Sequence, residues 1–157
     1  MWEAFLWNSK RFDLVMKRFL IALLFAVALI PNMGCGDPKG DPVSVANSEA
    51  GYTEAKTMVL DGSYETALPK LESAIAGGGL GPDLYVEALL LRAQCYAMTG
   101  KLELAEADMT KAEQGSPSEA LMELTKGVIL EKQGKSAESK AAMAKAKRLD
   151  PTLKQPK

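Results

Sequence analysis

The sequence predicts an all-α fold: a short solenoid of three helix–turn–helix repeats that follows an N-terminal signal or anchor segment. The first observation is a recurring glycine, at Gly62, Gly100 and Gly134, which are 38 and then 34 residues apart. The second is an alanine five residues after the glycine, at Ala67 and Ala105. A period of about 34 residues is typical of stacked helical hairpins, in which each unit buries its apolar face against the next.

The third observation is the distribution of aromatic residues. Beyond Cys35 the chain has four tyrosines and no tryptophan or phenylalanine. The core must therefore consist of Leu, Ala, Met, Val and Ile, and small alanines let helices approach closely, which suits helical pairs better than a sheet sandwich. The net charge of −1 provides no basic surplus for nucleic acid.

Residues 1–35 form a predicted leader. Met16 is followed by two basic residues and then by twelve apolar residues, 19–30, which is the pattern of a secretory signal peptide. We therefore expect translation to start at Met16. The apolar run is shorter than the ~20 residues of a transmembrane helix.

The end of the leader resembles a known processing signal. Gly34 stands directly before Cys35, just after the apolar run, and this arrangement resembles a bacterial lipoprotein signal. The resemblance implies that Cys35 is acylated and becomes the first residue of the mature protein. A secreted protein cut elsewhere and an uncleaved anchor are the alternatives. Two or three acyl chains would anchor stably, whereas a single chain binds a membrane only marginally.

The rest of the chain divides by composition and repeat spacing. A polar stretch with two prolines predicts a flexible tether over 36–47. The repeats are expected over 48–151, and a short polar tail that frays is expected over 152–157. The three repeats are predicted at about 48–79, 83–116 and 117–151.

The repeats resemble the tetratricopeptide repeat. Ala93 stands seven residues before Gly100, where that family prefers a small residue, and Tyr96 stands four before it, where the family prefers an aromatic one. Gly127 takes the small position seven residues before Gly134. The resemblance implies helical hairpins whose first helices line a concave surface that binds other proteins.

The start of the third repeat has its own pattern. Ser116, Pro117, Ser118 and Glu119 predict a capping box, with Pro117 at the first helical position. In a capping box the serine side chain accepts a hydrogen bond from the backbone N–H of the glutamate, and the glutamate side chain accepts one from the backbone N–H of the serine. This pattern predicts that the helix begins beside Pro117.

The candidate peptide groove consists of two positions in each first helix, which stand ten and six residues before the turn glycine. They are occupied by Tyr52, Lys56, Leu90, Gln94, Leu124 and Val128. Some tetratricopeptide proteins hold a peptide carboxylate with Lys and Asn at such positions. Only Lys56 and Gln94 are polar donors here, so that specificity does not carry over. We expect a mostly apolar groove for a helix or an extended peptide; the alternative is that some of these residues pack inside the array.

The sequence does not predict catalysis. It has no histidine, which removes the usual general base and the commonest metal ligand. Cys95, in an apolar helical stretch, is predicted to be a buried inert thiol. Two glycine-containing segments, 77–81 and 134–136, lack the spacing of phosphate-binding loops. We therefore expect no catalytic residue, no cofactor and no metal ion.

These observations predict a lipid-anchored adaptor or assembly factor of the bacterial cell envelope. Its expected partners are another envelope protein or peptide and, through lipid on Cys35, a membrane. The expected localisation is the periplasmic face of a membrane or the cell surface. The alternative is a structural lipoprotein that self-associates, as a homodimer, through an exposed terminal helix.

Overall fold

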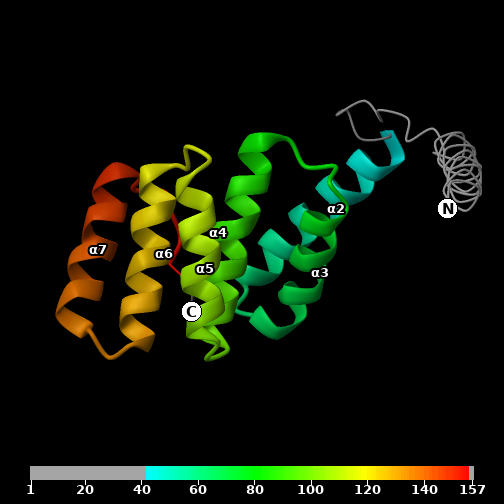
Figure 1. The fold of residues 1–157 in the computed structure, drawn as a ribbon. Helices are drawn as coiled ribbons and strands as arrows, with labels where there is room; N and C mark the ends of the chain where they lie inside the picture. The colour runs from blue at the N-terminus through cyan, green and yellow to red at the C-terminus, as the bar shows by residue number, and fades with distance from the viewer. Residues whose placement is uncertain (1–41, 156–157) are drawn as a thin grey trace, which may run out of the picture. The chain divides into compact units, whose positions relative to one another are not determined.

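The computed structural model describes residues 42–155, and these residues form six α-helices and no strand (Figure 1). The predicted leader, the start at Met16 and the acylated Cys35 lie outside the described residues. Within the described part the predicted all-α repeat array is confirmed. The helices are α2 (Pro42–Leu60), α3 (Tyr64–Ala76), α4 (Pro82–Met98), α5 (Leu102–Glu113), α6 (Glu119–Lys132) and α7 (Ser136–Leu149).

Three hairpin turns share one backbone conformation. Gly62, Gly100 and Gly134 have positive φ angles of 85°, 80° and 79°, a region that glycine enters without a steric penalty. In each turn the N–H group after the glycine donates to a carbonyl five residues earlier, which is the Schellman pattern at a helix C-terminus. These bonds run from Ser63 to Met58 (2.8 Å), from Lys101 to Tyr96 (2.8 Å) and from Lys135 to Leu130 (2.9 Å). The recurring glycines therefore correspond to three equivalent hairpins, α2–α3, α4–α5 and α6–α7.

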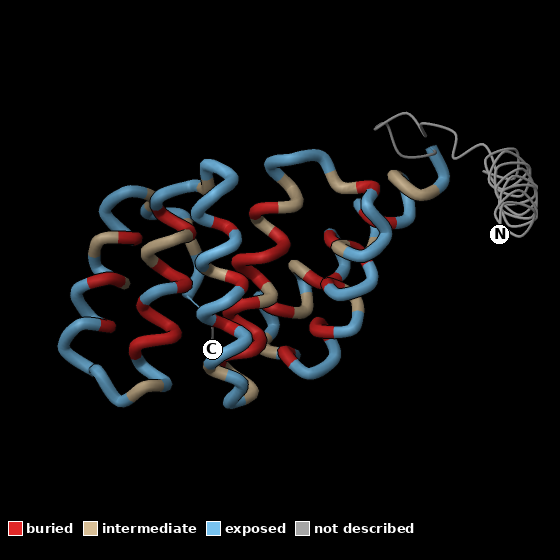
Figure 2. The backbone as a smooth tube through the Cα atoms, viewed as in Figure 1, coloured by how far each residue is buried: buried red, intermediate tan, exposed pale blue. Residues whose placement is uncertain are grey.

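Small residues lie where the paired helices approach most closely. Ala67, Ala93 and Ala105 are fully buried. At Gly127 an added Cβ would lie 2.6 Å from Cγ of Met143, so only glycine lets α6 and α7 pack at their present distance. Figure 2 shows the buried positions recurring along each helix. The small residues that define the sequence repeat are therefore constraints on helix packing.

The first helices of the three pairs are neighbours of one another. The central helix α4 contacts both α2 and α6, while α3 packs on α4 and α5 packs on α6. Because α4 is enclosed by these neighbours, ten of its seventeen residues are buried. The array therefore has one face made by α2, α4 and α6, as expected for stacked helical pairs.

A buried ion pair joins the two helices of the central repeat. The Arg92 guanidinium donates from Nε to Oδ2 of Asp108 (2.6 Å) and from Nη2 to Oδ1 (2.7 Å). Both side chains are mostly buried, and the bidentate geometry fixes their orientation. Hydrogen bonding to Asp108 raises the pKa of Arg92 above its ordinary value. On the same side of α4, the Tyr96 hydroxyl donates to Glu72 of α3 (2.9 Å).

The first helix begins earlier than predicted. It starts at Pro42, within the expected tether 36–47, and not near residue 48. Contacts with the loop after α3 explain the longer helix: Ser44 Oγ donates to the Gly77 carbonyl (2.8 Å). A Cβ at Gly79 would collide with the Ser44 backbone, so this glycine allows the loop to lie directly on the helix. The local pattern of polar residues does not indicate these long-range contacts.

The predicted capping box before α6 is wrong. The helix begins at Glu119 with Ser118 at its N-cap, and no side chain caps it. Ser116 instead has a positive φ of 58°, and Pro117 precedes the helix. The connection is tight at this point, since a Cβ on Gly115 would collide with Val86 of α4. The close passage over α4 therefore fixes the backbone here in place of the local capping pattern.

Candidate binding groove

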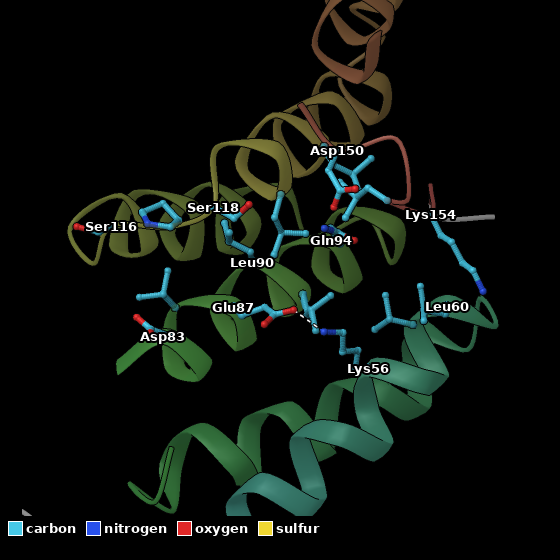
Figure 3. A pocket seen from close by; sticks show the side chains of 17 residues that line it. Lys56, Leu60, Asp83, Glu87, Leu90, Gln94, Ser116, Ser118, Asp150 and Lys154 are labelled. Carbon is cyan, nitrogen blue, oxygen red and sulfur yellow. Dashed lines mark hydrogen bonds and ion pairs between the residues drawn. The ribbon is translucent and has the colours of Figure 1, made fainter. Parts of the chain in front are cut away.

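A hollow of about 420 Å³ lies on the face formed by the three first helices. Figure 3 shows labelled side chains from α2, α4, the loop before α6 and the C-terminal segment pointing around it. We call it the groove. Its lining consists of Lys56, Val59, Leu60, Asp83, Val86, Glu87, Leu90, Leu91, Gln94, Ser116, Pro117, Ser118, Leu121, Leu124, Asp150, Leu153 and Lys154.

The groove brings together four of the six predicted groove residues. These are Lys56, Leu90, Gln94 and Leu124. Leu90, Gln94 and Leu124 are almost fully buried and form its floor, while Lys56 is partly exposed at its edge. The lining thus combines an apolar floor with polar and charged edges.

The other two predicted groove residues do not line the groove. Tyr52 and Val128 are 5% and 1% exposed and belong to the apolar core. Both side chains pack into a core cluster that also contains residues of α3, α4 and α5, so they face the interior of the array. Burial, and secondly Glu87, raise the pKa of the Tyr52 phenol.

A hydrogen bond beneath the groove floor connects two repeats. Gln94 Nε2 donates to Thr125 Oγ1 (2.9 Å), and the Thr125 hydroxyl donates to the Leu121 carbonyl one turn earlier (2.9 Å). Gln94 is 2% exposed and Thr125 is fully buried. A buried amide needs such a partner, because an unsatisfied donor there costs about 1–3 kcal/mol. The bond therefore fixes α4 against α6 directly under the groove.

The charged residues of the groove are unevenly paired. Lys56 forms an ion pair with Glu87 (2.6 Å), and their side chains are 45% and 31% exposed, so solvent screens the pair. Asp83 stands in the first turn of α4, where the helix dipole favours a negative charge. Asp150 adds a third carboxylate.

Glu87 and Leu121 are groove residues that the sequence analysis missed. Both stand thirteen residues before a turn glycine, in repeats 2 and 3. Positions thirteen, ten and six before the glycine follow the spacing of one helical face. Extending the predicted stripe by one step would have found both residues.

The C-terminal tail was also missed, because it was expected to fray. Leu153 is half-buried, packs against the apolar cluster that includes Val86, Leu121 and Leu124, and lines the groove. Figure 1 shows the chain turning back after α7. The residues after α7 are therefore part of the groove wall.

The turn that returns the tail is held by the Asp150 side chain. Its Oδ1 accepts from the Thr152 N–H (2.9 Å) and from the Thr152 hydroxyl (2.6 Å). The Leu153 N–H donates to the Asp150 carbonyl (3.3 Å). The hydroxyl bond and then the N–H bond lower the pKa of Asp150. This local turn aims Leu153 at the floor of the groove.

Residues 124–153 match the family model of the tetratricopeptide repeat. This stretch runs from Leu124 in α6 through the turn at Gly134 and α7 to Leu153. This stretch is thus similar to a tetratricopeptide repeat, and the two preceding hairpins have the same turn geometry as its own. Tetratricopeptide repeats are typically non-catalytic modules that mediate binding to other proteins. No curated protein and no solved structure matches the chain.

The remaining chemical features of residues 42–155 are few. Within this range no three His, Cys, Asp or Glu side chains gather where they would hold a metal ion. None of the helices described is both long and apolar enough to cross a membrane. Cys95 is buried, as predicted, and burial raises the pKa of its thiol to about 12. At neutral pH the thiol is therefore protonated and a poor nucleophile.

Proposed function

We propose that this protein is a membrane-tethered tetratricopeptide lipoprotein that acts as an adaptor or assembly factor in the bacterial cell envelope. The observation that carries the proposal is the groove, because it crosses the first helices of all three repeats and has an apolar floor with charged edges. Concave surfaces of stacked repeats are the usual binding surfaces of such arrays. The ligand that fits this shape is a segment of another protein.

Tethering completes the proposed role. The leader sequence and Cys35 support export and acylation, which would hold the repeats at the membrane surface. Confinement to a surface raises the effective concentration of the adaptor near an envelope partner. Binding, not catalysis, is the proposed activity, and it requires neither cofactor nor metal ion.

Chemical cross-linking in intact cells, followed by purification of the full chain, tests both parts of the proposal. Wild type is compared with Cys35→Ser, which removes the acylation site and leaves the described residues unchanged. We expect one dominant envelope protein to be captured by wild type and much less of it by Cys35→Ser.

Two results would count against the proposal. Equal capture by both chains would contradict the tether and leave the adaptor role. Cross-links between copies of this chain alone, unchanged in Cys35→Ser, would contradict the adaptor role and favour the self-associating structural lipoprotein.

A further inference from the structure

The groove of this protein already contains a ligand-like segment, its own C-terminal tail. Leu153 enters from the Asp150 turn and packs against the apolar cluster that includes Val86 of α4 and Leu121 and Leu124 of α6. It is the sole apolar residue of the tail after α7 and is only half-buried. The tail therefore shows which side chain the groove accommodates, and its partial burial means that little apolar contact holds it there.

The charges beside Leu153 indicate what stands next to the apolar residue of a partner. Without residues 150–155, the lining has Asp83 and Glu87 against one cation, Lys56. Lys56 is already engaged by Glu87 at 2.6 Å. Lys154 supplies the second positive charge, and Figure 3 shows it extending toward the α2 end of the groove, where Leu60 also lies. A basic residue after the leucine thus offsets the net negative charge of the remaining lining.

We propose that the groove binds an extended segment of a partner protein in which a leucine-sized apolar residue is followed by a lysine or arginine. The tail, with Leu153 and Lys154, occupies the same place in the free protein and must leave before the partner binds. Since the array is a binding module only under the proposed function, this inference rests on that proposal. It adds the chemistry of the ligand and a built-in competitor.

The competition has a predictable size. Half-burying one leucine favours the closed tail by about fivefold, equivalent to about 1 kcal/mol at 1.4 kcal/mol per tenfold. A ligand then binds the wild-type chain about fivefold more weakly than a chain whose tail is open. A short tether corresponds to an effective concentration of about 1 mM, so the isolated tail should bind an open groove with a Kd of roughly 0.2 mM.

An NMR titration measures this competition. The probe is a peptide of residues 150–155 with blocked ends, and the hosts are full-length chains in detergent: wild type, Leu153→Asp and Leu104→Asp. Leu153→Asp expels the tail by placing a charge against the apolar floor. Leu104, an exposed leucine of α5 outside the groove, provides the matched control.

Saturable binding to Leu153→Asp is expected, about fivefold tighter than to wild type and to Leu104→Asp. A probe with glutamate in place of Lys154 should bind more weakly, and a probe with aspartate in place of Leu153 should not bind. Equal affinity of wild type and Leu153→Asp would overturn the competition. Indifference to the lysine substitution would overturn the proposed ligand chemistry.

A second variant covers the case in which Leu153→Asp does not fold. Thr152→Ala removes the hydroxyl that donates to Asp150 and keeps Leu153. It should loosen the turn and give a probe affinity between those of the wild-type and open chains; no change would contradict the role of the turn.

Cross-linking in cells separates failure of this inference from failure of the proposed function. If the open chain captures a partner in cells but does not bind the probe, only the inference is wrong. If it does neither, both are wrong.

Discussion

Replacing Thr125 by valine isolates the buried hydrogen bond beneath the groove. Valine keeps the shape of threonine but cannot accept the bond from Gln94, whose side-chain nitrogen then loses its partner at a site that is 2% exposed. An unsatisfied buried donor costs about 1–3 kcal/mol, so we expect Thr125→Val to lower the free energy of unfolding by about 2 kcal/mol.

The opposite replacement should cost less. In Gln94→Leu the Thr125 hydroxyl still donates to the Leu121 carbonyl, so no buried donor is stranded. The expected loss is below about 1 kcal/mol, since only one net hydrogen bond disappears. In the double variant both partners are apolar, and its stability should lie within about 0.5 kcal/mol of that of Gln94→Leu.

Urea denaturation of the full chain, followed by far-ultraviolet circular dichroism, supplies the four stabilities of this cycle. A double variant that loses the sum of the two single losses would refute the reasoning, because it would mean that the two side chains are not coupled. A Gln94→Leu chain less stable than Thr125→Val would refute the assigned direction of the bond.

Three further predictions use other sites. Gly51→Ala should stabilise the chain by about 0.5–1 kcal/mol, because this helical glycine has room for a Cβ. Gly100→Ala should destabilise the chain by about 1–2 kcal/mol, because the φ angle of Gly100 is +80°. Equal shifts of the melting temperature in the two variants would contradict this contrast. Gly127→Val should cost about 1–3 kcal/mol by overpacking α6 against α7, and an unchanged denaturation midpoint would argue against close contact. In a Cys35→Ser chain, Cys95 should resist a thiol reagent at about pH 8 until denaturant is added. Because burial raises the pKa of the Cys95 thiol to about 12, the protonated thiol favours the folded state. Its contribution to the free energy of unfolding is complete at pH values below the unfolded-state pKa of about 8.5 and is lost as the pH rises toward 12. Cys95→Ala should reduce this decline.

The repeat architecture was predictable from the sequence because its signals are local backbone constraints. Gly62, Gly100 and Gly134 each occupy the same left-handed turn, so their spacing directly reports the spacing of the hairpins. Ala93 and Gly127 recur because paired helices approach closely at those positions. In an array of this kind the structure of one repeat therefore largely predicts the structure of the next.

The groove was predictable only in part because burial depends on which neighbours cover a residue. Tyr52 and Leu90 occupy the same position of their repeats, yet one belongs to the core and the other to the groove floor. The early start of α2 depends on Ser44 and Gly77, which are 33 residues apart. Leu153 gave no periodic signal, since it is a single apolar residue in a polar tail. These features arise from long-range contacts, which a local pattern does not encode.

Site-specific photo-cross-linking in cells tests the central claim that the groove is the surface that contacts another protein. A photoreactive residue is placed at Asp83, exposed on the groove edge, or at Lys140, exposed on α7 and outside the groove. The account predicts that the Asp83 position captures a distinct partner protein and that the Lys140 position does not. Capture from Lys140 alone, or equal capture from both positions, would contradict a role for the groove.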